Sequence, residues 1–241
     1  MVEQLLINND DYYVPDANQL VTEDDTPVDN FASAKQQRLL VSSLYSSLQQ
    51  TFLAEANVGI YYTDLQPPIV PDVFLSLDVQ VPENWCEKQN RCYMVWRFGK
   101  PPEVVLEIVS NKEGDELGKK LQIYEHMRAS YYIVYDPNQQ LGEKVLHVYE
   151  LRGRRYFESQ ETWLEQVGLG VTLWEGEFES RHDTWLRWCY QDGTVLSTGD
   201  ERASQAEQRA SQSEQRASQA EQRAQILAER LRAMGIDPDT I

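Results

Sequence analysis

The stretch from residue 104 to residue 135 constrains the fold more than any other part of the chain. It begins with a short apolar run at 104–109 and ends with another at 131–135. Between them, residues 116–129 place apolar side chains at helical spacing. A strand, a helix and a strand joined by short links predict a crossover between two parallel neighbours in one sheet.

A single carboxylate interrupts the first apolar run. Glu107 is surrounded in sequence by valine, leucine and isoleucine, and burying an unpaired carboxylate among such residues costs several kcal/mol. A carboxyl group in that position is protonated, paired with a cation or bound to a metal. An ion pair to Lys112 or to an arginine and a metal site both fit the pattern.

The length and composition bound the number of domains. With 241 residues, 41% of them hydrophobic, the chain can bury one core and carry an appendage. We expect an acidic, irregular arm at 1–30, a globular domain at 31–199, a heptad-repeat helix at 200–235 and a short C-terminal end at 236–241.

Three features of the composition indicate the compartment. No apolar segment is long enough to cross a membrane, and no signal peptide is visible. Cys86, Cys92 and Cys189 form no zinc-like pair, which favours a reducing environment. We therefore expect a cytoplasmic protein without a membrane partner.

The other segments of the domain give coarser predictions. The apolar spacing predicts a helix over 32–53, and alternation predicts a short strand at 58–63. The remaining predictions are a hairpin of strands 73–81 and 92–98, a second hairpin of 145–151 and 155–158, and a tryptophan-rich segment at 163–190 that closes the core and ends in a short helix.

The tail repeats Arg-Ala-Ser-Gln-Ala-Glu-Gln every seven residues. This is the heptad repeat of a coiled coil, but its core positions a and d are mostly alanine, so each layer would bury little apolar surface. Arginines occupy the g positions 202, 209 and 216, and glutamates occupy the e positions 207, 214 and 221, five residues further on. In a parallel dimer, each of these arginines can pair with a glutamate of the other helix. The six residues are Arg202, Arg209, Arg216, Glu207, Glu214 and Glu221. The tail predicts a parallel homodimer through residues 200–234, with a solvated single helix as the alternative.

Three side chains form a candidate chemical site. Asp72 and Glu107 are expected on separate strands, and two converging carboxylates can hold Mg²⁺ or Mn²⁺, with the backbone carbonyl of Ile108 as a third oxygen ligand. A lysine on the following helix could stabilise charge on a scissile phosphate. Lys120 shares a helical face with Tyr124 and is favoured over Lys119.

These residues resemble the PD-(D/E)xK restriction-endonuclease-like superfamily. Pro71-Asp72, Glu107 in Leu-Glu-Ile-Val-Ser, Lys-Leu-x-x-Tyr at 120–124 and the Tyr-Tyr-Ile-Val-Tyr-Asp-Pro run look like its poorly characterised cyanobacterial branch. The resemblance spans roughly residues 20–190. It implies an α/β (α+β) fold with a central mixed sheet flanked by helices, and Mg²⁺-dependent cleavage of DNA by Asp72, Glu107 and Lys120.

The chain departs from the superfamily motif at one position. Val109 stands two residues after Glu107, where the motif has lysine. In the cyanobacterial branch the lysine is thought to have moved to the next helix, which fits Lys120. Either Lys120 takes the role of the motif lysine or the site is idle.

The charge balance keeps a second class of function open. The net charge is −17, and residues 1–199 hold 16 basic against 31 acidic side chains, which argues against nonspecific attraction to a polyanion. The alternative to an endonuclease is therefore a catalytically inactive, nuclease-like interaction module that self-associates through the tail.

Overall fold

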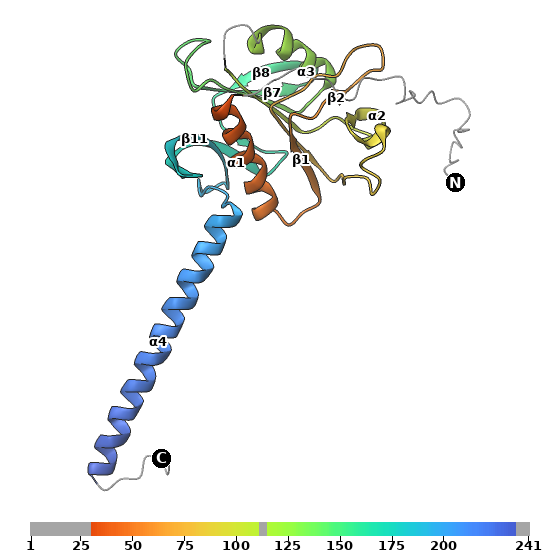
Figure 1. The fold of residues 1–241 in the computed structure, drawn as a ribbon. Coiled ribbons are helices and arrows are strands. Elements are labelled where there is room, and N and C mark those ends of the chain that lie inside the picture. Colours follow the sequence, from red (N-terminus) through yellow and green to blue (C-terminus); the bar gives the residue numbers. More distant parts are fainter. Residues whose placement is uncertain (1–29, 111–114, 235–241) are drawn as a thin grey trace, which may run out of the picture. The chain divides into compact units, whose positions relative to one another are not determined.

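A computed structural model describes residues 30–110 and 115–234 of the chain. Contacts divide the chain into two units, Met1–Leu196 and Ser197–Ile241. The first unit is built on a six-stranded mixed sheet in the order β1-β3-β5-β6-β7-β8 (Figure 1). Its strands are β1 Phe52–Ala56, β3 Val73–Leu77, β5 Val104–Ile108, β6 Tyr131–Tyr135, β7 Leu146–Arg152 and β8 Arg155–Ser159.

The centre of this sheet is the predicted strand-helix-strand stretch. β5 and β6 pair in parallel with Val104 opposite Tyr131, and both strands are buried along their whole length. The connection contains a π-helical turn, Glu116–Lys120, and α3, Leu121–Met127. The predicted parallel crossover is confirmed, because strands buried on both faces read as continuous apolar runs.

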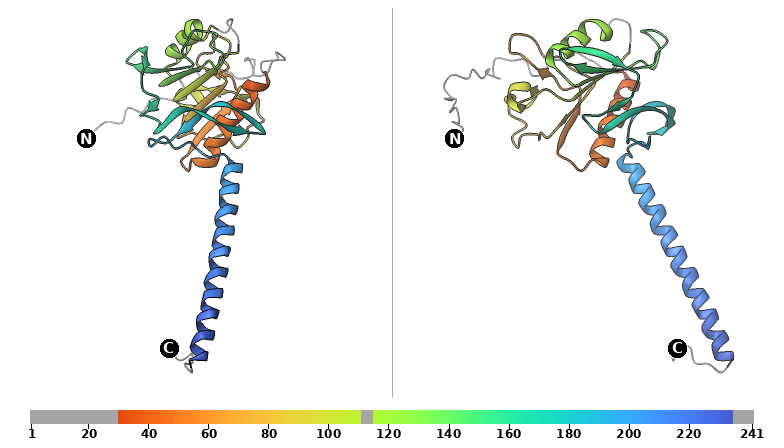
Figure 2. Two further views of the ribbon diagram at one scale, coloured as in Figure 1. Left: turned by 90° about the vertical axis from the view of Figure 1, so that its left-hand side faces the viewer. Right: turned by 180° about the vertical axis from the view of Figure 1, so that it is seen from behind.

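Each face of the sheet has its own cover (Figure 2). On one face, helix α1 (Phe31–Ser47) and a second sheet of β9 (Trp163–Leu164), β10 (Leu169–Phe178) and β11 (Arg181–Cys189) pack on alternate side chains such as Leu106 and Ile133. On the other, α3 packs on the intervening side chains, such as Val105 and Tyr132. The expected mixed sheet with flanking helices is confirmed.

The small elements at the edge of the first unit differ from the sequence predictions. The predicted hairpin of 73–81 and 92–98 is wrong: β4, Tyr93–Met94, pairs in parallel with β2, Ile60–Tyr61, and is followed at once by the short helix α2, Val95–Phe98. A 3-10 turn, Lys88–Asn90, precedes β4. The hairpin of β7 and β8 is confirmed.

Two further predictions need correction. The helix predicted over 32–53 ends at Ser47, because Phe52 and Leu53 pair with β3 and the sheet ladder overrides their helical spacing. Residues 163–190 end in strand β11 and not in a helix. The core role predicted for their tryptophans holds for Trp185 and Trp188, which are buried, whereas Trp163 and Trp174 are only half-buried.

The described part of the second unit contains helix α4, Gly199–Ala233. Thr198 caps it, since its hydroxyl accepts from the N–H of Glu201 while the Glu201 carboxylate accepts from the N–H of Thr198. No helix among the described residues is both long and apolar enough to span a bilayer. The acidic arm predicted at 1–30 lies outside the described residues, apart from Asn30.

Candidate active site

Glu107 lies near the end of β5 and faces α3. Its side chain is buried, with 2% of the residue exposed. Lys120 Nζ donates to Glu107 Oε2 at 2.8 Å, and Tyr124 Oη donates to Oε1 at 2.5 Å. Both partners come from the segment that follows the strand, and they lie on one helical face because they are four residues apart.

The surroundings of Glu107 favour its protonated form. Burial, which disfavours the charge, raises its pKa to about 8; the charge of Lys120 opposes this shift and the charge of Asp72 adds to it. The effect of Asp72 shows that the two carboxylates interact. A further positive charge beside Glu107 would therefore stabilise its ionised form.

Asp72 reaches the same place from the start of β3. The β3–β5 register pairs Val73 with Leu106, and extended by one residue it sets Asp72 across from Glu107, where side chains share a face. Asp72 Oδ2 accepts from the N–H of Ile108 at 2.6 Å, and Oδ1 accepts from Gln37 Nε2 at 2.7 Å. Two donors thus fix the orientation of this carboxylate.

The backbone carbonyl of Ile108 points toward β3. The next N–H, of Val109, donates to Tyr135 of β6 on the opposite side. Because the peptide between Ile108 and Val109 is planar and trans, its carbonyl projects away from its N–H and hence toward the side of Asp72. This is the direction that the predicted third oxygen ligand requires.

The two candidate lysines occupy different environments. Lys119 is exposed, whereas Lys120 contacts Glu107 at 2.8 Å and Glu116 at 3.5 Å. Burial alone would lower the pKa of Lys120, but the charges of Glu107, Glu116 and Asp72 outweigh it, and the pKa is raised. Lys120 is therefore a cation held at the carboxylates.

A π-helical turn brings Lys120 to this position. Asp115 caps the turn by accepting from the N–H of Lys119 and adopts a left-handed conformation with φ of 53°. Gly118 leaves room for this cap, because a Cβ at that position would meet the Asp115 carboxylate and force it to shift. Val109, at the position of the motif lysine, is buried in the apolar cluster with Tyr124.

Sequence reasoning missed two polar residues of the site and gave no role to a third. Gln37 on α1 is buried and binds Asp72, and Glu116 is a buried acid beside Lys120. Tyr124, noted only for sharing a face with Lys120, binds Glu107. The sequence did contain a signal for Gln37, because a polar residue on the apolar face of a helix needs a hydrogen-bond partner when that face is buried.

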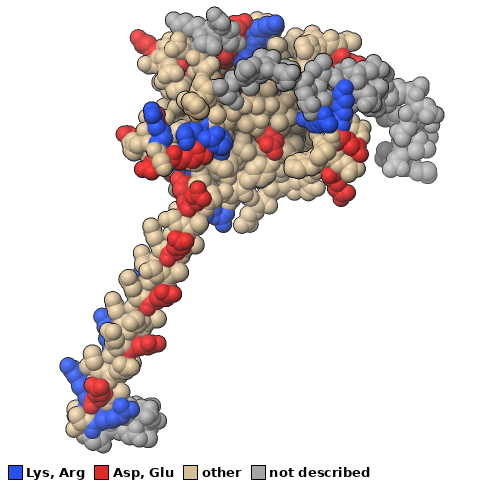
Figure 3. All heavy atoms as spheres, in the orientation of Figure 1, with Lys and Arg blue, Asp and Glu red and all other residues tan. Residues whose placement is uncertain are grey.

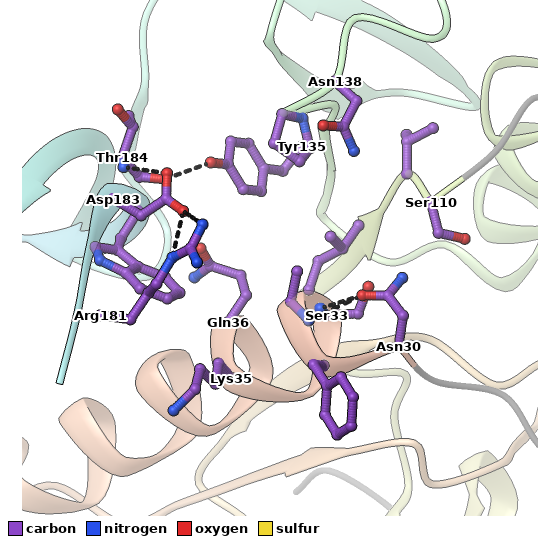
Figure 4. Close-up of a pocket in the computed structure, with 16 residues that line it drawn as sticks. Asn30, Ser33, Lys35, Gln36, Ser110, Tyr135, Asn138, Arg181, Asp183 and Thr184 are labelled. Carbon is purple, nitrogen blue, oxygen red and sulfur yellow. Dashed lines mark hydrogen bonds and ion pairs between the residues drawn. The ribbon is translucent and has the colours of Figure 1, made fainter. Parts of the chain in front are cut away.

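A cavity of about 400 Å³ opens at the end of β5, on the α1 side of the sheet. Ile108 to Ser110, the first turn of α1 and the start of β11 line it. Figure 4 shows Asn30 capping α1 at its rim, and Tyr135 donating across it to the carbonyl of Thr184 at 2.9 Å. Since Glu107 faces α3, its carboxyl group lies on the other side of the sheet from this cavity.

The described residues contain no group of three or more His, Cys, Asp or Glu side chains that could hold a metal. The oxygens that β3 and β5 place in this region are hard donors: the carboxylates of Asp72 and Glu107 and the backbone carbonyl of Ile108. Mg²⁺ is often bound by one or two carboxylates and keeps several waters. The donor set therefore fits Mg²⁺, and Mn²⁺ accepts the same ligands.

Comparison with known proteins identifies the family. Residues 5–174 match the Uma2 family, described as "Putative restriction endonuclease". The chain belongs to this family, and the predicted membership of the restriction-endonuclease-like superfamily is confirmed. The family supports a nuclease function.

One similar solved structure is described as the "Crystal structure of a putative nuclease belonging to DUF820 from Anabaena variabilis ATCC 29413 at 1.96 A resolution". It is 18% identical to this chain, with a TM-score of 0.41, and the match covers 56% of this chain and 71% of that one. No curated protein matches the chain.

Proposed function

We propose that the protein is an Mg²⁺-dependent endonuclease that hydrolyses phosphodiester bonds in DNA. The observation that carries the proposal is the buried Glu107, contacted by Lys120 at 2.8 Å and coupled electrostatically to Asp72. Perturbed carboxyl groups beside a fixed cation are typical of active sites. Membership of the Uma2 family supports the reaction class.

Asp72, Glu107 and the carbonyl of Ile108 would hold the ion. Bound there, Mg²⁺ would polarise a phosphoryl oxygen and lower the pKa of a coordinated water. The pKa of Glu107, raised to about 8 in the metal-free protein, means that a cation would compete with a proton for this group. Mn²⁺ would support the same reaction.

The chain's own residues have separate roles in this proposal. Lys120 would stabilise the charge that develops on the scissile phosphate, a form of catalysis that needs a fixed cation near the reacting oxygens. Gln37 and the N–H of Ile108 orient Asp72, and Tyr124 orients Glu107. These three hold the carboxylates in place before substrate arrives.

DNA is the substrate that the family supports, although the net charge of −17 gives the protein no general attraction for it. Much of the phosphate binding would then depend on the ion and on Lys120 beside the carboxylates. The free thiols Cys86, Cys92 and Cys189 suit a reducing cytoplasm, where we place the reaction.

The test is a nicking assay on supercoiled plasmid with the full chain, in Mg²⁺, in Mn²⁺ and with a chelator. We expect metal-dependent conversion to open circles that Asp72→Ala and Glu107→Ala abolish. The matched control is Lys119→Ala, a substitution one residue from Lys120 that leaves the carboxylates untouched. Activity that survives both carboxylate substitutions would exclude this site, and a wild-type protein that binds neither metal by calorimetry would favour the inactive interaction module.

A further inference from the structure

Helix α4 has no buried side chain along its length. It runs for 35 residues, which is a length of about 50 Å. Three large apolar side chains near its C-terminal end are exposed by half or more: Ile226, Leu227 and Met234, at 51%, 58% and 66%. Exposed apolar side chains in such a group mark an interaction surface.

Two of these side chains belong to one seam. Leu227 and Met234 are d positions, and Leu231 is the a position between them. Knobs at successive a and d positions pack into holes of a facing helix. The last two turns therefore carry the apolar contact, while the preceding a and d positions are alanine or serine and bury little.

The charges of the repeat do not stabilise a single helix. Within one helix, ion pairs form between residues three or four apart. Arg209 has only Gln205, Ala206, Gln212 and Ser213 at those distances. Arg216, Glu214 and Glu221 also lack an opposite charge there. Figure 3 shows acidic side chains at intervals along α4.

The same charges match a second copy in one orientation. In a parallel pair, each g side chain lies next to the e side chain five residues further along the partner helix. Arg202, Arg209 and Arg216 would each meet a glutamate at Glu207, Glu214 and Glu221 of the other copy. In an antiparallel pair, g faces g and e faces e, so arginine would meet arginine.

We propose that α4 is a docking surface for a second copy of this chain, joined in parallel and in register. Leu227, Leu231 and Met234 supply the apolar contact, and the arginine-glutamate pairs select the parallel orientation. The proposal does not depend on nuclease activity. Its consequence is that a parallel pair joins two copies of the first unit to the same end of the two helices, since each α4 follows its own domain in the chain.

The first test measures the mass of the full chain by sedimentation equilibrium at low salt. We expect twice the chain mass of 28.0 kDa, and a dissociation constant at least tenfold weaker for Leu227→Asp. A charge variant carries Arg202→Glu, Arg209→Glu and Arg216→Glu; its complement carries Glu207→Arg, Glu214→Arg and Glu221→Arg. Each alone should be monomeric, and an equimolar mixture should restore the dimer.

The control variant places the same new charges outside the seam, with Gln208→Glu, Gln215→Glu and Gln222→Glu at f. It should dimerise like the wild type. Circular dichroism of each variant reports whether the catalytic domain remains folded. A monomeric wild type at 100 µM, or an f variant that dissociates as readily as the g variant, would overturn the proposal.

Orientation is tested by Ala203→Cys, an a position near the start of α4, in a Cys86→Ser background. A parallel pair places the two new thiols opposite each other, and mild oxidation should crosslink the dimer. Leu231→Cys should crosslink in the same way. A dimer that crosslinks at neither position would be antiparallel, or formed through another surface, and would also overturn the proposal.

Discussion

The charged residues around Glu107 and those of α4 differ in where their partners lie. Glu107 is 2% exposed, and Lys120, Tyr124 and the nearby Asp72 come from the same chain. The repeat of α4 has no buried residue and no matching charges at the spacing that one helix uses. The first set prepares a site within one molecule, whereas the second becomes complementary when another molecule is present.

The largest expected effect comes from removing the charge at the buried site. Glu107→Gln keeps the shape and an acceptor for Tyr124 but removes a metal ligand, and should lower the nicking rate by about 1000-fold or more. Plasmid nicking in Mg²⁺ measures this. A rate within about tenfold of the wild type would show that Glu107 does not hold the ion.

The same substitution should stabilise the metal-free protein. The folded-state pKa of Glu107 is raised from 4.5 to about 8, so its contribution to stability is fully present below pH 4.5 and is lost as pH rises through 8. The melting temperature of Glu107→Gln in a chelator should therefore exceed that of the wild type increasingly between those pH values. An unchanged difference across this range would contradict the raised pKa.

The next effect separates two neighbouring lysines. Lys120→Ala should reduce the nicking rate by about 100-fold, because a fixed cation at the carboxylates is lost, while Lys119→Ala should change it less than about threefold since that side chain is exposed. Single-turnover kinetics of both variants make the comparison. If both variants lose the same amount of activity, the two lysines contribute only a general attraction for phosphate, and Lys120 has no specific role.

A smaller effect should appear in the response of the two regions to salt. Raising NaCl from 0.05 to 0.5 M should weaken the dimer through α4 by about tenfold, because its ion pairs would be exposed and screened. The buried contact of Lys120 and Glu107 is screened much less. Sedimentation of the dimer and thermal unfolding of the chain across the same salt series would measure the two effects. A dimer whose dissociation constant does not change with salt would contradict the proposed arginine-glutamate pairs.

The smallest effect concerns an exposed charge cluster. Glu179, in the turn between β10 and β11, binds Arg38 and Lys35 of α1, and its hydrogen bonds to them hold its pKa at about 2. A depressed carboxyl pKa gives stability above pH 4.5 that is lost as pH falls through 2. Because solvent screens the cluster, Glu179→Gln should cost less than about 1 kcal/mol at pH 6 and nothing near pH 2. Urea unfolding at both pH values measures the difference.

The sequence was sufficient where a local pattern and the tertiary structure agreed. The apolar composition of 104–109 and 131–135 predicts strands, and the structure has a buried strand in each segment. The order of Asp72, Glu107 and Lys120 along the chain was enough to propose that these three side chains lie together. The pattern failed at Phe52 and Leu53, whose helical spacing was overridden by pairing with β3. It also failed at β4, whose partner β2 is distant in sequence.

Two features of the site could not be read from spacing. Gln37 meets Asp72 only because α1 crosses the sheet at that point, which is a property of packing and not of either segment alone. The position of Lys120 depends on a π-helical turn, and an ordinary helical count does not predict that insertion. Helix α4 shows the opposite case, since its repeat predicts the helix fully.

Adjacent glutamines on α1 connect the two sheets of the domain. Gln36 exchanges two hydrogen bonds with the backbone of Leu186 in β11, at 2.7 and 3.0 Å, and Gln37 donates to Asp72. A shift of β11 along the helix axis would therefore be transmitted, over a single residue, to a carboxylate of the proposed metal site. We therefore expect that a substitution which displaces the small sheet changes the orientation of Asp72 without replacing either carboxylate of the proposed site.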